Sequence, residues 1–120
     1  MPTNDKAAAE LQAVLDKIAS WPEPFPAIGQ QLHETILSAG PKLKPRLWYG
    51  GPGYAAGRST PVMVFFRVDD GVMSLGVSEK AHAERETDSL LMPAAFYVDE
   101  VDERTLERVA RLVRAAFARP

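Results

Sequence analysis

The chain has 120 residues, a length that fits one compact domain. It contains no cysteine, which excludes disulfides, thiolate nucleophiles and cysteine-type zinc sites, and its formal net charge of -2 lacks the basic excess of nucleic-acid-binding proteins. No apolar run approaches the roughly 20 residues that a membrane span needs, and the N-terminal segment has no apolar signal core, so we expect a cytoplasmic protein with neither nucleic-acid nor membrane partners.

Two amphipathic helices are predicted in the first 40 residues. The first places four apolar side chains on one face, at positions i, i+3, i+4 and i+7: Leu11, Val14, Leu15 and Ile18. A connector with three prolines, residues 20–26, ends this helix and begins the second one. The second helix buries Ile28, Leu32 and Ile36, and it ends at the pair Gly40-Pro41.

Residues 62–68 and 72–77 are predicted to form an antiparallel hairpin, because Asp70-Gly71 is a strong two-residue turn signal. This turn pairs apolar residues with one another: Val68 with Met73, Phe66 with Leu75, and Val64 with Val77. A shift of one residue would destroy that pattern, so the register is well specified. One face of the hairpin is therefore buried, and the other face carries Phe65, Arg67 and Gly76.

Two more strands and a third helix complete the prediction. Residues 43–49 form an early strand and residues 94–98 a late one, with a charged loop or short helix at 79–89. The last helix follows an N-cap at Asp99 or Asp102 and has one apolar stripe, while Arg104, Arg108 and Arg111 line its solvated side. The fold class is therefore α+β, a two-layer sandwich of an antiparallel sheet with two N-terminal helices and one C-terminal helix on one face.

The stretch 47–54 (LWYGGPGY) joins aromatic residues to three glycines. A dinucleotide site needs a helix directly after the glycines, and a P-loop needs a different spacing followed by Lys-Ser or Lys-Thr, so neither motif fits. We interpret Gly50, Gly51, Pro52 and Gly53 as a structural turn that leaves the early strand.

Aromatic and cationic side chains beside this turn are candidates for ligand binding. Arg46 and Trp48 share one face of their strand by alternation. If that face is also the face of Phe65 and Arg67, it forms a groove for a small anionic or planar ligand, or a partner surface. The candidate ligand-binding residues are Arg46, Trp48, Tyr49, Tyr54, Phe65 and Arg67. The alternative, a small hydrophobic cluster under the loop, remains open.

The segment from Tyr49 to Tyr54 resembles the Tyr-Gly-x-Pro-x-Tyr signature of the YdhG-like family of small bacterial domains. Residues 21–24 (WPEP), 75–81 (LGVSEKA) and 92–96 (MPAAF) are similar to further motifs of that family, and the similarity spans roughly residues 7–118. The resemblance implies a frataxin-like α/β sandwich. Most members have no assigned activity, and one branch is associated with iron delivery through acidic surface residues.

The sequence therefore predicts a small binding or adaptor domain whose ligand is a small molecule or a protein, in a chain that is a monomer or a homodimer. It predicts no catalytic residues and no cofactor. An alternative is an iron-binding chaperone that would use five acidic residues: Asp69, Asp70, Asp99, Glu100 and Asp102. A second alternative is an enzyme of unknown reaction.

Overall fold

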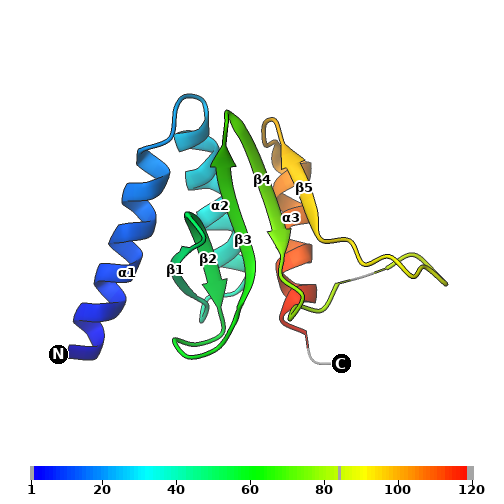
Figure 1. The fold of residues 1–120 in the computed structure, drawn as a ribbon, viewed down its shortest axis with the longest axis horizontal. Coiled ribbons are helices and arrows are strands. Elements are labelled where there is room, and N and C mark those ends of the chain that lie inside the picture. The colour runs from blue at the N-terminus through cyan, green and yellow to red at the C-terminus, as the bar shows by residue number, and fades with distance from the viewer. Residues whose placement is uncertain (1, 84, 119–120) are drawn as a thin grey trace.

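Three helices and five strands make up the fold in a computed structural model, which describes residues 2–83 and 85–118 (Figure 1). The elements are α1 (Pro2–Ala19), α2 (Phe25–Ala39), β1 (Lys44–Trp48), β2 (Gly51–Ala55), β3 (Val62–Asp69), β4 (Val72–Val77), β5 (Ala95–Val98) and α3 (Glu103–Ala116). The strands form one open antiparallel sheet in the order β1-β2-β3-β4-β5. The predicted α+β arrangement of sheet and helices is confirmed.

The hairpin of β3 and β4 has the predicted register. Val68 pairs with Met73, Phe66 with Leu75, and Val64 with Val77. Asp70 and Gly71 form its turn, with positive φ values of 52° and 76°. This left-handed backbone is the conformation that a two-residue turn requires and that glycine adopts at little cost.

The hairpin of β1 and β2 turns earlier than the sequence indicated. Its loop is Tyr49-Gly50, with φ values of 48° and 83°, and Trp48 pairs with Gly51 across the base of the turn. The prediction that the turn extends through Gly51, Pro52 and Gly53 is therefore wrong, since these residues belong to β2.

Gly51 and Pro52 suit a strand at this position for two separate reasons. A β-carbon on Gly51 would overlap the backbone oxygen of Phe66 and lie 2.6 Å from the Cβ of Arg67, so β3 approaches β2 more closely than any other residue would allow. Pro52 pairs with Leu47 of β1, and the pairing of β2 with β3 begins only at Gly53. The missing N–H of the proline is therefore not required by the ladder to β3.

The helices cover one face of the sheet and enclose the core. In Figure 1, α1 lies beside β1, while α2 and α3 lie behind the sheet and pack against each other. Side chains that are at most 2% exposed come from every part of this layer, including Val14, Ile18, Leu32, Ile36, Val64, Phe66, Met73 and Val113. No helix within residues 2–83 and 85–118 covers the other face of the sheet, so its side chains are open to solvent or to one another.

Helix α3 begins at Asp102, one of the two predicted caps. A carboxylate oxygen of Asp102 accepts hydrogen bonds from the backbone N–H and the hydroxyl of Thr105, at 2.8 and 2.6 Å. These bonds lower the pKa of the Asp102 carboxyl from its ordinary value. The positive end of the helix favours the same charged form, so the cap fixes where α3 starts after β5.

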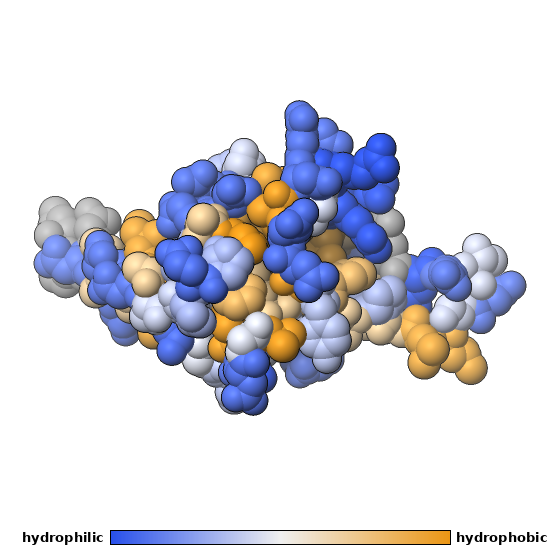
Figure 2. Space-filling view, turned by 90° about the horizontal axis from the view of Figure 1, so that it is seen from above, coloured by the Kyte–Doolittle hydropathy of each residue, from blue (hydrophilic) through white to orange (hydrophobic). Residues whose placement is uncertain are grey.

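The segment between β4 and β5 projects from the body (Figure 1), and apolar surface appears at that end of the molecule in Figure 2. Leu90 is 95% exposed and Leu91 is 81% exposed. Residues 79–83 and 85–89 form a loop with no regular helix, so the loop alternative of the prediction is the correct one. None of the helices within the described residues is long and apolar enough to cross a bilayer.

Candidate functional site

Strand alternation places Arg46, Trp48, Phe65 and Arg67 on the sheet face that carries no helix. Arg46 pairs with Gly53, and Gly53 pairs in turn with Phe65, so these positions face the same side. Trp48 is two residues after Arg46, and Arg67 is two residues after Phe65, which puts both on that side as well. The sequence analysis left open whether Arg46 and Trp48 share a sheet face with Phe65 and Arg67, and in the structure they do.

Trp48 is the centre of an aromatic cluster on this face. Its ring centroid lies 4.9 Å from that of Phe65, with the planes at 47°, and 4.6 Å from that of Tyr49, with the planes at 85°. Trp48 and Phe65 are half-buried, whereas Tyr49 is 76% exposed. The Trp48–Tyr49 pair is edge-on, an arrangement that aromatic rings prefer, and the Trp48–Phe65 pair is tilted. The rings of the cluster are therefore in close contact and still reach solvent.

Glycines allow the two half-buried rings to lie close to the sheet. A β-carbon on Gly53 would lie 2.8 Å from the Cβ of Trp48, and one on Gly76 would lie 3.2 Å from the Cζ of Phe65. The space above Gly76 is therefore occupied by the ring of Phe65. Gly53 of β2 and Gly76 of β4 therefore form a floor for the two rings.

A shallow hollow lies beside the aromatic cluster. Its walls come from β1, β3, the end of β4 and the residues that lead into β5: Trp48, Phe65, Val77, Ser78, Glu79, Met92 and Ala94. Glu79 is the one charged residue in this lining, and the other walls are aromatic, aliphatic or small. This lining suits a planar or apolar group, with a carboxylate at its margin. We call it the sheet-face hollow.

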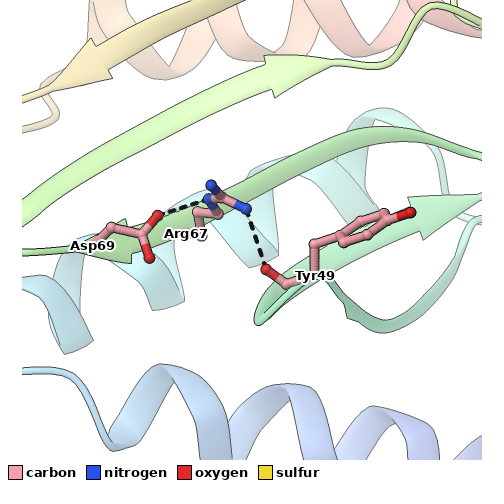
Figure 3. Close-up of polar contacts among 3 residues, drawn as sticks. All are labelled: Tyr49, Arg67 and Asp69. Atoms are coloured by element: carbon pink, nitrogen blue, oxygen red, sulfur yellow. Dashed lines mark hydrogen bonds and ion pairs between the residues drawn. The ribbon is translucent and has the colours of Figure 1, made fainter.

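The two arginines of the predicted groove are already engaged by the protein. Arg46 donates from its guanidinium to the backbone oxygens of Arg58 and Thr60, at 3.0 and 2.9 Å, and so holds the loop between β2 and β3. Arg67 donates to the backbone oxygen of Tyr49 at 3.2 Å and pairs with Asp69 at 2.7 Å (Figure 3). Neither arginine lines the sheet-face hollow, so the structure reduces the predicted aromatic and cationic groove to its aromatic part.

Tyr54 lies on the opposite face of the sheet, in the core. It is fully buried, and its hydroxyl lies 2.7 Å from Nδ1 of His33 in α2. Burial raises the pKa of Tyr54 and lowers that of His33, so a protonated phenol faces a neutral imidazole. The prediction that Tyr54 belongs to the ligand-facing set with Trp48 is wrong, because Tyr54 pairs with Pro45, which lies on the other face of β1 from Trp48.

The sequence analysis did not predict the contact between His33 and Tyr54, because it identified no partner for this histidine. A signal was available: His33 is four residues after Gly29 and three before Ile36, which are both buried on the same helix face. A polar side chain on a buried face needs a hydrogen-bond partner. Only the fold shows that this partner comes from β2, 21 residues away.

Stability should fall at mildly acidic pH because of His33. Burial lowers its pKa, and the neighbouring Glu34 carboxylate acts in the opposite direction. An unfolded histidine titrates at about pH 6.5, so the unfolded chain takes up this proton before the folded chain does. The contribution of His33 to the free energy of unfolding should therefore be largest above about pH 6.5. It should decrease as the pH falls from that value to the lower pKa of the folded state.

Urea unfolding between about pH 8 and about pH 5.5 measures this effect, since most carboxylates are still ionised there. The variant His33→Gln keeps a polar partner for Tyr54 but does not titrate, so its free energy of unfolding should depend less steeply on pH than that of the wild type. Parallel pH profiles for the two proteins would contradict the assignment.

The acidic residues of the iron alternative gather at one end of the sheet without forming a ligand cluster. The β3–β4 turn and the end of β5 lie at the same end, because Met73 pairs with Val98. Asp69 is paired with Arg67, and Asp102 caps α3. Within residues 2–83 and 85–118 there is no group of three or more histidine, aspartate or glutamate residues placed to hold a metal ion.

Comparison with known proteins adds no relative. No protein-family model matches the chain, and neither the curated proteins nor the solved structures contain a match. The resemblance to the YdhG-like family therefore stays a prediction from the motifs.

Proposed function

We propose that this protein is a cytoplasmic binding or adaptor domain that holds a planar or aromatic group of its ligand in the sheet-face hollow. The observation that supports this proposal is the pair Trp48 and Phe65, packed at 4.9 Å on a helix-free sheet face and still open to solvent. A solvent-accessible aromatic pair beside an apolar hollow is a typical stacking platform for a flat ligand or for a side chain of a partner protein.

A binding role is better supported than catalysis by the distribution of titratable groups. Catalytic acids and bases usually have a perturbed pKa within a cleft. His33 and Tyr54 in the core and Asp102 at the cap of α3 have a pKa shifted by their surroundings, and none of the three borders the sheet-face hollow. The chemistry available in the hollow is stacking, apolar contact and one carboxylate.

A thermal-shift screen with a collection of metabolites, repeated on Trp48→Ala, tests the proposal. A ligand present at about 100 times its dissociation constant stabilises the folded state by about 2.7 kcal/mol, which gives an upward shift that is easily measured. We expect a compound with a planar group to raise the melting temperature of the wild type. The shift should be largely lost in Trp48→Ala, with each protein compared to its own ligand-free melting temperature.

Tyr97→Ala is the matched control. Tyr97 pairs with Ser74, so it is an aromatic residue on the same sheet face, but it is 82% exposed and lies on β5, outside the hollow. The ligand should stabilise Tyr97→Ala as much as it stabilises the wild type. A ligand that stabilises all three proteins equally would show that the sheet-face hollow is not its site.

A further inference from the structure

A second hollow lies on the helix side of the sheet, between β5, α3 and the segment that follows β4. It has a volume of about 220 Å³. Phe96 faces this side because it pairs with Leu75 of the core, and Leu112 of α3 forms the opposite wall. We call it the β5–α3 pocket. Among the described residues, Val77 alone lines both this pocket and the sheet-face hollow.

Two arginines of α3 open onto this pocket, and its lining contains no acidic residue within residues 2–83 and 85–118. The guanidinium carbon of Arg108 lies 4.9 Å from the centroid of the Phe96 ring, over its face. Arg111 follows three residues later, on the same side of the helix. Neither arginine forms an ion pair with a residue that the structure describes, whereas Arg67 on the other sheet face does.

Both arginines are exposed, as the sequence interpretation of a solvated helix face predicts, and they also border the pocket. Two like charges that converge on one hollow repel each other, and an anion between them would remove that repulsion. A guanidinium also presents several N–H donors in a plane, which matches the two oxygens of a carboxylate. The positive charge of the β5–α3 pocket therefore favours an anionic ligand group.

Apart from His82, the remaining walls are apolar. Phe96 and Leu112 provide an aromatic and an aliphatic surface, and Val77 also contributes. A volume of about 220 Å³ is below the roughly 300 Å³ at which ordinary small-molecule pockets begin. The space suits a single ring or a short branched chain, and it is too small for a nucleotide.

His82 ties the outer wall of the pocket to the end of α3. Its backbone N–H donates to the backbone oxygen of Ala116 at 3.2 Å, and its Nδ1 lies 3.3 Å from the backbone oxygen of Ala115. The segment after β4 is thereby held against α3 at the point where it borders the pocket. A wall that is fixed before binding lowers the ordering cost for a ligand.

We propose that the β5–α3 pocket binds a small organic anion with a compact apolar body, such as an aromatic carboxylate. The carboxylate lies between Arg108 and Arg111, and the ring lies against Phe96 and Leu112. The proposal goes beyond the stacking function of the sheet-face hollow and does not depend on it, because the two sites share neither an aromatic residue nor an arginine.

Titration of the ¹⁵N-labelled protein with phenylacetate tests this proposal by NMR. We expect saturable shifts of the backbone amides of Ala83, Phe96 and Leu112. The neutral analogue 2-phenylethanol and inorganic phosphate should each bind at least about tenfold more weakly than phenylacetate, because each lacks one half of the recognised chemistry. A tenfold change in the dissociation constant corresponds to one charge-assisted contact. Equal binding of the alcohol or of phosphate would overturn the proposed ligand class.

Arg111→Gln should weaken phenylacetate binding about tenfold, for the same reason. Arg104→Gln is the matched control, since Arg104 is an exposed arginine of the same helix that does not line the pocket. It should bind as the wild type does. Equal losses in the two variants would indicate a general charge effect, and shifts confined to amides around Trp48 would place the ligand elsewhere; either result would overturn the pocket assignment.

Discussion

Replacing Phe66 by alanine should lower the free energy of unfolding by about 3 to 5 kcal/mol. Phe66 is fully buried at the centre of the helix-facing layer. Its ring packs edge-on against Trp21, at 5.9 Å between centroids, and stacks on Tyr54 at 6.1 Å. Alanine would remove these contacts and leave a cavity that a close-packed layer can fill only in part.

Equilibrium urea unfolding, followed by circular dichroism, measures this loss. Phe65→Ala is the matched control, because Phe65 is the neighbouring residue of β3 on the opposite, half-exposed face. It should cost clearly less, about 1 to 2 kcal/mol, since its ring is only partly removed from water. A larger loss for Phe65→Ala than for Phe66→Ala would mean that the core lies on the other side of the sheet.

Gly51→Ala should destabilise the protein by about 3 kcal/mol or more, an unusually large effect for the addition of one methyl group. The new Cβ would overlap the backbone oxygen of Phe66 and lie 2.6 Å from the Cβ of Arg67. A backbone atom has no other rotamer to adopt, so β2 and β3 would have to move apart. That movement would also disturb the floor beneath Trp48.

Gly57→Ala is the control for this substitution. The nearest atoms to a β-carbon at Gly57 belong to the Thr60 side chain, at 3.7 Å, which is ordinary contact. Its free energy of unfolding should stay within about 0.5 kcal/mol of the wild type, or increase, because alanine restricts the unfolded chain. The melting temperatures of the two variants give a direct comparison. Similar values for both would contradict the close approach of β2 and β3.

The projecting segment between β4 and β5 borders both candidate sites. Met92 and Ala94 line the sheet-face hollow, while His82 and Pro93 line the β5–α3 pocket. Val77, the last residue of β4, contributes to both. The shapes of the two hollows therefore depend on how this segment leaves β4 and enters β5, more than on the aromatic and glycine-rich residues that first draw attention in the sequence.

Local patterns were sufficient to predict much of the fold. Period-2 alternation around Asp70-Gly71 determined the pairing of Phe66 with Leu75, and helical spacing determined the buried face of α2. The cap at Asp102 is equally local, because it involves a residue only three positions away. In each case the interacting groups lie within one hairpin or one turn of helix, so the sequence contains the whole interaction.

The candidate site was predicted less well than the fold, because one turn was misplaced and because several of its contacts join residues far apart in the sequence. The interval 50–53 was interpreted as a turn because it is rich in glycine, but a two-residue hairpin needs positive φ only at Tyr49 and Gly50. The glycine of β2 at position 51 instead satisfies the close approach of β3, a constraint that comes from another strand.

The sequence by itself determined the three helices and the strands other than β2, the β3–β4 register, and the existence of an aromatic group near the glycines. The tertiary structure decided which side chains remain free. It engages Arg46 with the loop at Arg58 and Thr60, and it places Arg108 over Phe96 at the edge of a pocket. The physical reason is the sequence separation over which each interaction acts. Strand alternation and turn geometry act between near neighbours in the chain. The partner of a long polar side chain belongs to an element that reaches it only when the sheet and helices pack together.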